Sequence, residues 1–209
     1  DDLGARVTQI SLLSAVAQGK PSLPDDARAD FGTISQTTRE LVSALYETVW
    51  AVNPENDNLD ALANYLCQMG NQLCSQAQLR CRLEVPDLPA QVALSSQVRH
   101  HLIMAVKEAL HNIIKHARAS EVRIRITFTA ARKEVHVPSS VSTGAVLHIC
   151  IQDDGCGFEV ASKLPGNGLT NLRRRMEGTG GDFAIESKLA VGTTVTLRLP
   201  VATGATGAT

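Results

Sequence analysis

The chain has 209 residues, a formal net charge of −1 and only 3% aromatic side chains. Its length suits one large or two smaller domains, and the missing basic excess argues against a nucleic-acid binder. No run approaches the roughly 20 apolar residues that span a bilayer, and no signal peptide is visible, so we expect a cytoplasmic chain with any membrane anchor in an upstream segment.

Two amphipathic helices are predicted at the N-terminus. The first covers residues 3–19 and ends at Gly19, and the stretch "KPSLPDDARADFG" (20–32) is typical of a loop. The second helix carries Thr38, Leu41, Leu45, Val49 and Val52 on one side and stops at Asn53-Pro54. Because two narrow apolar stripes cannot enclose a core, we expect a homodimer through residues 1–52 that forms a four-helix bundle. The alternative is that this hairpin packs on the rest of its own chain.

The rest of the chain predicts an α+β fold. Helices are expected at 59–79 and 95–117, and the strand candidates are "RCRLEV", "EVRIRITF", "AVLHICIQ", "FAIES" and "TTVTLRLP". Helices would then cover one face of a mixed sheet, as an α/β sandwich over residues 57–202 that follows the hairpin of residues 1–56. Residues 129–145 are expected to form a long connection, and residues 203–209 a flexible tail.

The cysteines offer no metal-ligand spacing. Cys67, Cys74 and Cys81 are seven residues apart and would share one helical stripe if the helix ran that far. We interpret them as small buried hydrophobic residues in a reducing compartment.

The segment "KEALHNIIKHA" (107–117) carries an unusual polar stripe. Glu108, Asn112, Lys115 and His116 recur at i, i+4, i+7 and i+8 and share one helical face. A merely solvated face would use Glu and Lys, since Asn lowers helix propensity. The stripe therefore indicates a functional site.

Two glycine-rich segments follow. "QDDGCGF" (152–158) comes after a strand, and Gly155 and Gly157 permit a tight turn and close approach to a ligand. An acid just before them can accept a hydrogen bond from an exocyclic amine. "PGNGLTNLRRRM" (165–176) places Gly166 and Gly168 before a helix that begins at about Leu169, where backbone amides attract phosphate.

A last segment, "VGTTV" (191–195), places Gly192 and Thr193 at the start of the final strand. Each segment alone is compatible with an ordinary turn. Their order along the chain makes a ligand site the better interpretation.

This ordered set resembles the ATP-binding domain shared by DNA gyrase, a heat-shock chaperone, histidine kinases and MutL, known as the GHKL or Bergerat fold. The polar stripe matches the N box, "DDGCGF" and "GNGLTNL" the two glycine boxes, and "GTT" the last box. "DDLGARVTQISLL" and "VWAVNPENDNLDALANYL" resemble the two dimerisation helices and the linker of sensor histidine kinases of the NarL-partner type. The resemblance runs from Asp1 to about Val201.

The resemblance implies a role for each residue of the site. Asn112 would bind Mg²⁺, while Lys115 and His116 would neutralise phosphate charge. Asp153 would accept from the adenine amine, supported by Thr193 directly or through water. Asp1, beside the acceptor histidine, would be the better catalytic base, and Glu108 the weaker candidate. The backbone around the nucleotide would come from Gly155, Gly157, Gly166, Gly168 and Leu169.

The chain departs from the family pattern at two positions. The phosphorylated histidine would stand immediately before Asp1, and none of the six histidines present precedes an acid. We therefore expect this stretch to bind ATP without phosphorylating itself, because the acceptor is truncated. Ala5 stands where phosphatase-active relatives often have Gln, so phosphatase activity by that route is not expected.

The sequence therefore predicts the catalytic core of a two-component sensor histidine kinase. It would use Mg·ATP to phosphorylate a histidine and pass the phosphate to an aspartate in a response-regulator receiver domain. One alternative is an ATP-binding regulatory module without kinase activity. An ATPase of the gyrase or MutL kind is disfavoured because only eight residues separate Gly157 from Gly166, too few for the usual long lid.

Overall fold

The computed structural model describes residues 2–89, 92–130, 144–159 and 168–201, and it forms two compact units, Asp1–Val52 and Asn53–Thr209. Residues 53–56, which the sequence analysis assigns to the hairpin, belong to the second unit. Most of the expected 129–145 connection and the whole 203–209 tail lie outside the described residues. Within the described ranges, no helix has the length and apolar character needed to cross a bilayer.

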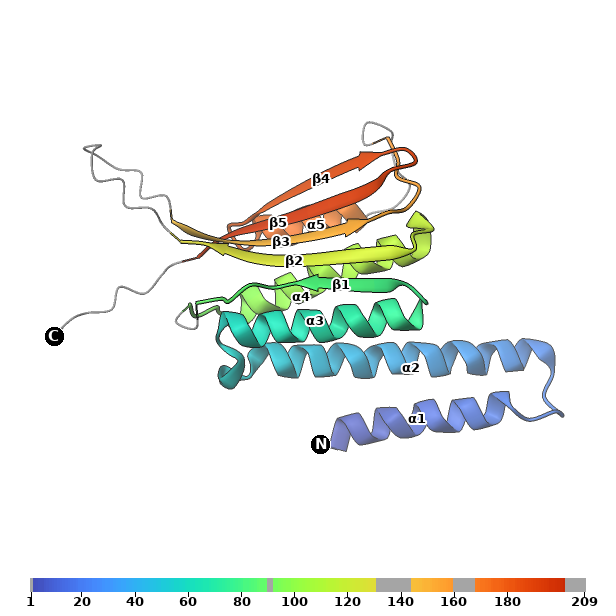
Figure 1. Cartoon of the computed structure of the whole chain (residues 1–209). Coiled ribbons are helices and arrows are strands. Elements are labelled where there is room, and N and C mark those ends of the chain that lie inside the picture. The colour runs from blue at the N-terminus through green and yellow to red at the C-terminus, as the bar shows by residue number, and fades with distance from the viewer. Residues whose placement is uncertain (1, 90–91, 131–143, 160–167, 202–209) are drawn as a thin grey trace, which may run out of the picture. The chain divides into compact units, whose positions relative to one another are not determined.

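The first unit is a helical hairpin of α1 (Asp2–Gln18) and α2 (Asp25–Val52), drawn in blue in Figure 1. The expectation of a loop through residue 32 is wrong, because α2 begins at Asp25. Asp25 and Asp26 lie in its first turn, where carboxylates interact favourably with the positive end of the helix dipole. The predicted stop at Asn53-Pro54 is confirmed by the end of α2 at Val52.

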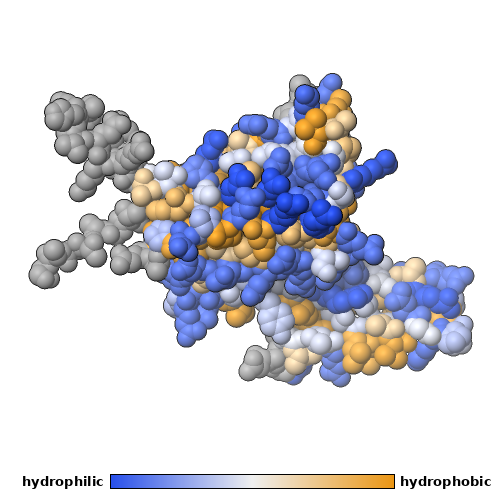
Figure 2. Space-filling view, in the orientation of Figure 1, coloured by the Kyte–Doolittle hydropathy of each residue, from blue (hydrophilic) through white to orange (hydrophobic). Residues whose placement is uncertain are grey.

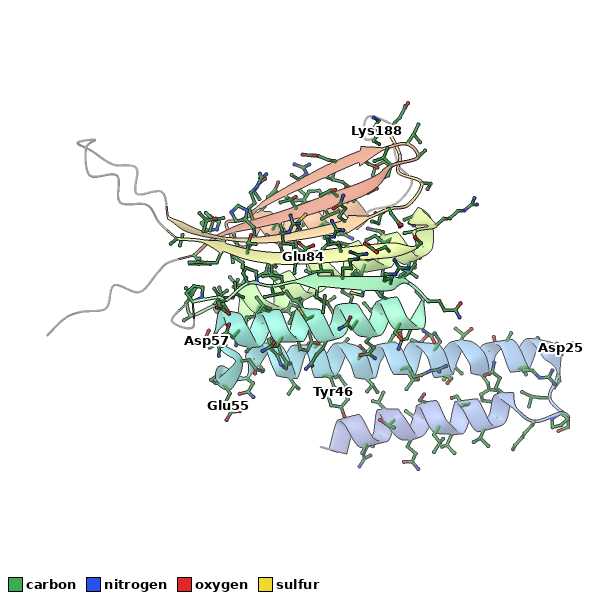
Figure 3. All side chains as sticks on the ribbon, in the orientation of Figure 1. Asp25, Tyr46, Glu55, Asp57, Glu84 and Lys188 are labelled. Atoms are coloured by element: carbon green, nitrogen blue, oxygen red, sulfur yellow. The ribbon has the colours of Figure 1, made fainter. Side chains whose placement is uncertain are left out.

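The hairpin leaves a large apolar surface exposed. Between its helices, the Ser11 and Ser35 hydroxyls each donate to the other residue's backbone carbonyl at 3.4 Å. Figure 2 shows orange, hydrophobic side chains gathered on this unit. The exposed apolar residues are Ile10, Leu12, Leu13 and Val16 on α1 and Ile34, Leu41, Tyr46, Val49 and Val52 on α2. Tyr46, labelled in Figure 3, is 71% exposed.

The second unit is a five-stranded mixed sheet with helices on one face (Figure 1). The strand order is β1-β2-β3-β5-β4; β1 runs parallel to β2 and the other neighbours are antiparallel. The α+β class predicted from the sequence is therefore confirmed. The strands are β1 (Arg80–Glu84), β2 (Glu121–Thr129), β3 (Ala145–Asp153), β4 (Asp182–Lys188) and β5 (Gly192–Val201). The helices are η1 (Pro54–Asn56), α3 (Leu59–Gln76), α4 (Ser96–Asn112), η2 (Ile113–Ala117) and α5 (Gly168–Glu177).

Alternation along the strands separates a buried face from a solvated one. In β2 and β3 the register pairs Ile124 with Ile151 and Val122 with Asp153, and all four side chains are buried. Leu102, Ile103, Val106 and Leu110 of α4 are buried with them. The inward face of β3 therefore ends in a carboxylate, at the edge of an otherwise apolar core.

A buried arginine fixes the start of α4. Arg99 is 2% exposed, and its guanidinium donates to Asp57 at 2.7 Å, to the Asn53 carbonyl at 3.2 Å and to the Leu94 carbonyl. Figure 3 labels Asp57 beside η1. Because a buried charge is tolerated only when it is paired, these contacts hold the η1 segment against the N-terminal end of α4.

The prediction that Cys67, Cys74 and Cys81 share one helical stripe is only partly correct. Helix α3 ends at Gln76, and Gln78, with a φ of 57°, turns the chain into β1, so Cys81 is a strand residue. Its thiol still contacts Cys74, whose pKa is raised to about 12, mainly by burial. Cys74 therefore remains a protonated, buried thiol, as a small hydrophobic residue would.

Candidate functional site

A cavity of about 450 Å³ opens between the C-terminal end of α4 and the buried face of the sheet. From the residues predicted by sequence, its lining contains Asn112, His116, Asp153, Gly157, Gly168, Leu169 and Thr193. Its apolar walls include Ala109, Ile113, Ile151, Ile185 and Val195. Residues from α4, η2, β3, α5, β4 and β5 are thus brought to one place. Asp1 and Gly166 lie outside the described residues.

The helix that carries the polar stripe changes its winding inside the cavity. The α-helix ends at Asn112, residues 113–117 form a π-helical turn, and Arg118 leaves it with a φ of 51°. The predicted single helix over 95–117 is therefore interrupted. Because a π turn holds more residues than an α turn, it rotates the side chains after Asn112 backwards around the axis. The side chains of Lys115 and His116 are both exposed, but His116 lines the cavity and Lys115 lies outside its described lining.

Glu108 and Asn112 meet the start of α5. A Cβ atom placed on Gly168 would lie 2.6 Å from Glu108 Oε1 and 3.4 Å from the Asn112 amide group. Only glycine fits between these side chains without displacing them. Two oxygen-bearing side chains thus flank the first backbone amides of α5, which have no partner within that helix.

Asp153 is the buried acid of the cavity. It is 3% exposed, and the backbone N–H groups of Gly155, at 2.8 Å, and of Thr193 donate to its carboxylate. Burial raises the pKa of Asp153, and these two hydrogen bonds offset part of the rise. A carboxylate has about four lone-pair sites, so capacity remains for a ligand donor.

The neighbouring Asp154 has a structural role. Its carboxylate accepts from the Ser120 N–H at 2.8 Å, the Ser120 hydroxyl at 2.5 Å and the Glu121 N–H at 2.9 Å. The pKa of Asp154 is lowered, chiefly by the hydrogen bond from the Ser120 side chain. It ties the end of β3 to the start of β2.

The first glycine loop is clamped between η2 and the β4–β5 turn. The Cys156 N–H donates to the Ala117 carbonyl, and the Cys156 carbonyl accepts from Ala190, both at 2.7 Å. Gly157 has a φ of +58°, and a Cβ there would collide with the carbonyl of Lys188, which Figure 3 labels near this turn. Gly155 packs as tightly against Ala117. Gly157 therefore lines the cavity, and Gly155 holds the loop against η2.

Ser187 is a residue behind the cavity wall that was not predicted from the sequence. Its hydroxyl accepts from the Phe158 N–H at 2.9 Å and lies 2.9 Å from the Thr193 hydroxyl. It therefore links the first glycine loop to the last box. A signal was present: Ser187 shares its strand face with Phe183 and Ile185, and a hydroxyl on an apolar face needs a partner.

The second glycine segment begins α5 at the cavity. Gly168, Leu169 and Thr170 line it, so the free amides of the helix start face a position suited to an anion. Arg173 is exposed, and its guanidinium carbon lies 5.6 Å from the centre of the Phe183 ring.

Comparison with known proteins agrees with this geometry. A family model described as histidine kinase-, DNA gyrase B- and HSP90-like ATPase matches residues 97–203. The signal transduction histidine-protein kinase/phosphatase UhpB of Salmonella typhimurium is 28% identical over 203 residues, which are 96% of this chain and 37% of that protein. The nitrate/nitrite sensor protein NarQ of Escherichia coli is 28% identical over 192 residues, or 88% of this chain and 31% of that protein. The chain thus spans about a third of the length of these relatives.

Solved structures show the same fold. The histidine kinase domain of the blue-light activated histidine kinase EL346 from Erythrobacter litoralis aligns with a TM-score of 0.60 at 20% identity, over 94% of each chain. At this identity the likeness concerns the fold alone. Together with the family match, it confirms the predicted α/β sandwich of the GHKL type.

Proposed function

The chain belongs to the histidine kinase-, DNA gyrase B- and HSP90-like ATPase family, and on that premise we propose that it is the catalytic core of a two-component sensor histidine kinase. It uses Mg·ATP to phosphorylate a histidine immediately before Asp1. The phosphate then passes to an aspartate of a response-regulator receiver domain. The site of action is the cytoplasm. The observation that carries the proposal is the cavity where Asn112, Asp153 and Thr193 converge within the family domain.

The adenine end of the cavity is formed by Asp153 and Thr193. A buried carboxylate in apolar walls selects a ligand that brings its own N–H donor, because an unpaired ionised acid there is costly. The exocyclic amine of adenine supplies that donor. The apolar side chains of Ile151, Ile185 and Val195 provide the surface against which a flat base packs.

The phosphate end is formed by the junction of α4, η2 and α5. Asn112 and His116 line it, and the first amides of α5, from Gly168 to Thr170, face it. The backbone of Gly157, which lines the cavity, would also surround the phosphates. We assign the same role to Gly166, which lies outside the described residues. Phosphoryl transfer needs mainly positioning and charge stabilisation, which these groups supply.

The side chains around Asn112 fit a magnesium ion. Among the described residues, no group of three or more His, Cys, Asp or Glu side chains is arranged to hold a metal. Mg²⁺ suits such a site, because it is commonly held by one or two protein oxygens together with substrate phosphates and water. We assign the Asn112 amide oxygen as its protein ligand, with Glu108 adjacent. The bound ion would neutralise charge on the phosphates.

Phosphorylation of a histidine by this core also requires the hairpin. We assign Asp1 as the base that activates the acceptor histidine and residues 1–52 as the homodimer interface. The exposed apolar side chains of α1 and α2 support the interface, since a stripe of this size is normally covered in a soluble protein.

The direct test uses γ-labelled Mg·ATP and the chain extended upstream through the residue that precedes Asp1. We expect protein-bound label that is lost in acid, stable in alkali and absent from an Asn112→Ala variant. The label should then move to a receiver domain and become alkali-labile there. ATP binding without any label would instead favour a regulatory module that uses nucleotide binding alone.

A further inference from the structure

Ser187 lies behind the cavity wall and makes three hydrogen bonds. The Phe158 N–H donates to its hydroxyl oxygen at 2.9 Å, and its hydroxyl donates to the Gly192 carbonyl at 3.3 Å. Its oxygen lies 2.9 Å from Thr193 Oγ1. Thr193 lines the cavity, while Ser187 is outside its described lining. Any effect of Ser187 on a ligand must therefore pass through Thr193 or Phe158.

The directions of these hydrogen bonds follow from the number of protons. A serine hydroxyl carries one hydrogen and two acceptor lone pairs. The carbonyl of Gly192 can only accept, so it takes the single Ser187 hydrogen. The Phe158 N–H can only donate, so it occupies one lone pair. With the Ser187 hydrogen on the Gly192 carbonyl, the remaining lone pair is available to the hydrogen of the Thr193 hydroxyl, 2.9 Å away.

We propose that Ser187 is a specificity-determining positioning residue, which fixes the Thr193 hydroxyl as a hydrogen-bond acceptor toward the nucleotide base. With its own hydrogen committed to Ser187, Thr193 presents only lone pairs to the cavity. The neighbouring Asp153 carboxylate, when ionised, is likewise an acceptor. The base-recognition end of the cavity is thus lined by two side chains that accept and cannot donate.

This polarity selects adenine over hypoxanthine. The adenine amine carries two N–H donors, one for each acceptor, directly or through an ordered water. Hypoxanthine has a carbonyl oxygen at that position, which two acceptors repel. The inference rests on the proposed function, because it assumes that this cavity binds an adenine nucleotide. A site built to pair polar groups can discriminate strongly against a ligand that leaves them unpaired.

The experiment measures binding of ADP and inosine diphosphate, both with Mg²⁺, to the whole chain by calorimetry. The wild type is expected to prefer ADP. In Ser187→Ala the Thr193 hydroxyl is free to rotate and donate, so the ratio of the two affinities should fall about 3- to 10-fold, the loss typical of one hydrogen bond. Ser187→Thr keeps the hydroxyl on a side chain suited to a strand and should retain the wild-type ratio.

The controls separate positioning from stability. Thr196→Ala removes a hydroxyl from the outward face of β5 and should leave both affinities and their ratio unchanged. Equal loss of ADP and inosine diphosphate binding in Ser187→Ala would overturn the proposal, since it would show only a structural role. A fall in the ratio of ADP to inosine diphosphate affinity in Ser187→Thr would also overturn the proposal. Wild-type protein that binds neither nucleotide would reject the proposed function itself.

Discussion

The buried carboxylate of Asp153 lowers the stability of the fold but provides an acceptor for a ligand. Its carboxylate is 3% exposed, and burial raises its pKa more than the two backbone hydrogen bonds lower it. Between the unfolded pKa of about 3.9 and the raised folded pKa, the folded chain therefore binds more protons than the unfolded chain. Stability from this group is highest in acid and falls as the pH rises through that window. When Asp153 is ionised, the two backbone hydrogen bonds offset part of its desolvation, and a ligand donor can offset more.

Replacing that acid should separate the two effects. Asp153→Asn retains an oxygen for the Gly155 and Thr193 amides but removes the buried charge. We expect the free energy of unfolding without nucleotide to rise by about 1 kcal/mol at pH 7, and the difference from wild type to shrink toward pH 4. ATP affinity should fall about 10- to 100-fold, because a charged acceptor is lost. Urea unfolding across pH and calorimetry measure both. A variant less stable than wild type at pH 7 would contradict the desolvation argument.

The exposed thiol of Cys156 reports on the cavity without disturbing it. Cys156 lines the cavity within the first glycine loop and is the exposed cysteine of the chain's described part. A maleimide should label it, and Mg·ATP at ten times its dissociation constant should slow the labelling about tenfold by mass action. Peptide mass spectrometry follows the site, and Cys156→Ser, which keeps the loop backbone, should bind ATP normally. Labelling at the same rate with and without nucleotide would mean that ATP binds elsewhere.

At the scale of elements, the π-helical turn η2 determines which basic side chain lines the cavity. In an uninterrupted α-helix, Lys115 and His116 would flank the position of Asn112. Both side chains are exposed, but the π turn leaves His116 in the described cavity lining and Lys115 outside it. π turns recur at functional sites, where they re-aim side chains.

The π turn predicts different effects for two neighbouring substitutions, and Lys115→Ala serves as the control for His116→Ala. His116→Ala should weaken Mg·ATP binding about 3- to 10-fold, as expected for one lost polar contact to a charged ligand. Lys115→Ala should change it less than about twofold, because Lys115 lies outside the described cavity lining and its charge is screened by water and salt. Nucleotide titrations of both variants in the same buffer provide the comparison. The reverse order of effects would indicate that the segment rewinds to an α-helix around the bound nucleotide.

The same elements show which features can be predicted from sequence. Strands with alternating apolar residues and helices bounded by caps or proline follow from local chemistry, as in β2 and at the α2 stop before Pro54. The start of α2 at Asp25 and the π turn do not, since a tertiary context overrides a loop-like composition or an α-helical period. The different environments of Asp153 and Asp154, and the hydrogen-bond partners of Ser187, depend on strand register across the sheet. No local pattern encodes that register.

At the scale of the whole molecule, nucleotide binding and self-association are expected to belong to different units. The described lining of the cavity comes from the Asn53–Thr209 unit, while the exposed apolar residues of α1 and α2 belong to the Asp1–Val52 unit. Nucleotide binding should therefore be separable from self-association. The proposed kinase activity would require both, because the proposed acceptor precedes the first helix.

A charge in the hairpin stripe tests this division. Leu41 is 52% exposed, and Leu41→Lys should weaken dimerisation by at least tenfold, because a buried leucine contributes about 1.5–3 kcal/mol and each dimer contains two. ADP affinity should not change. Gln36→Lys is the matched control: it adds the same charge on α2 at an exposed polar position beside Glu40, whose carboxylate accepts from Gln36 at 2.8 Å.

Sedimentation equilibrium over a range of concentrations, with calorimetry on the same samples, gives both quantities. Wild type and Gln36→Lys should be dimers where Leu41→Lys is largely monomeric. A monomeric wild type that still binds ADP would mean that the apolar stripe has another use, and the ATP-binding regulatory module would then replace the kinase core. Loss of ADP binding in Leu41→Lys would show instead that the hairpin contributes to the nucleotide site. The two units would then act as one, and the cavity would be complete only in the dimer.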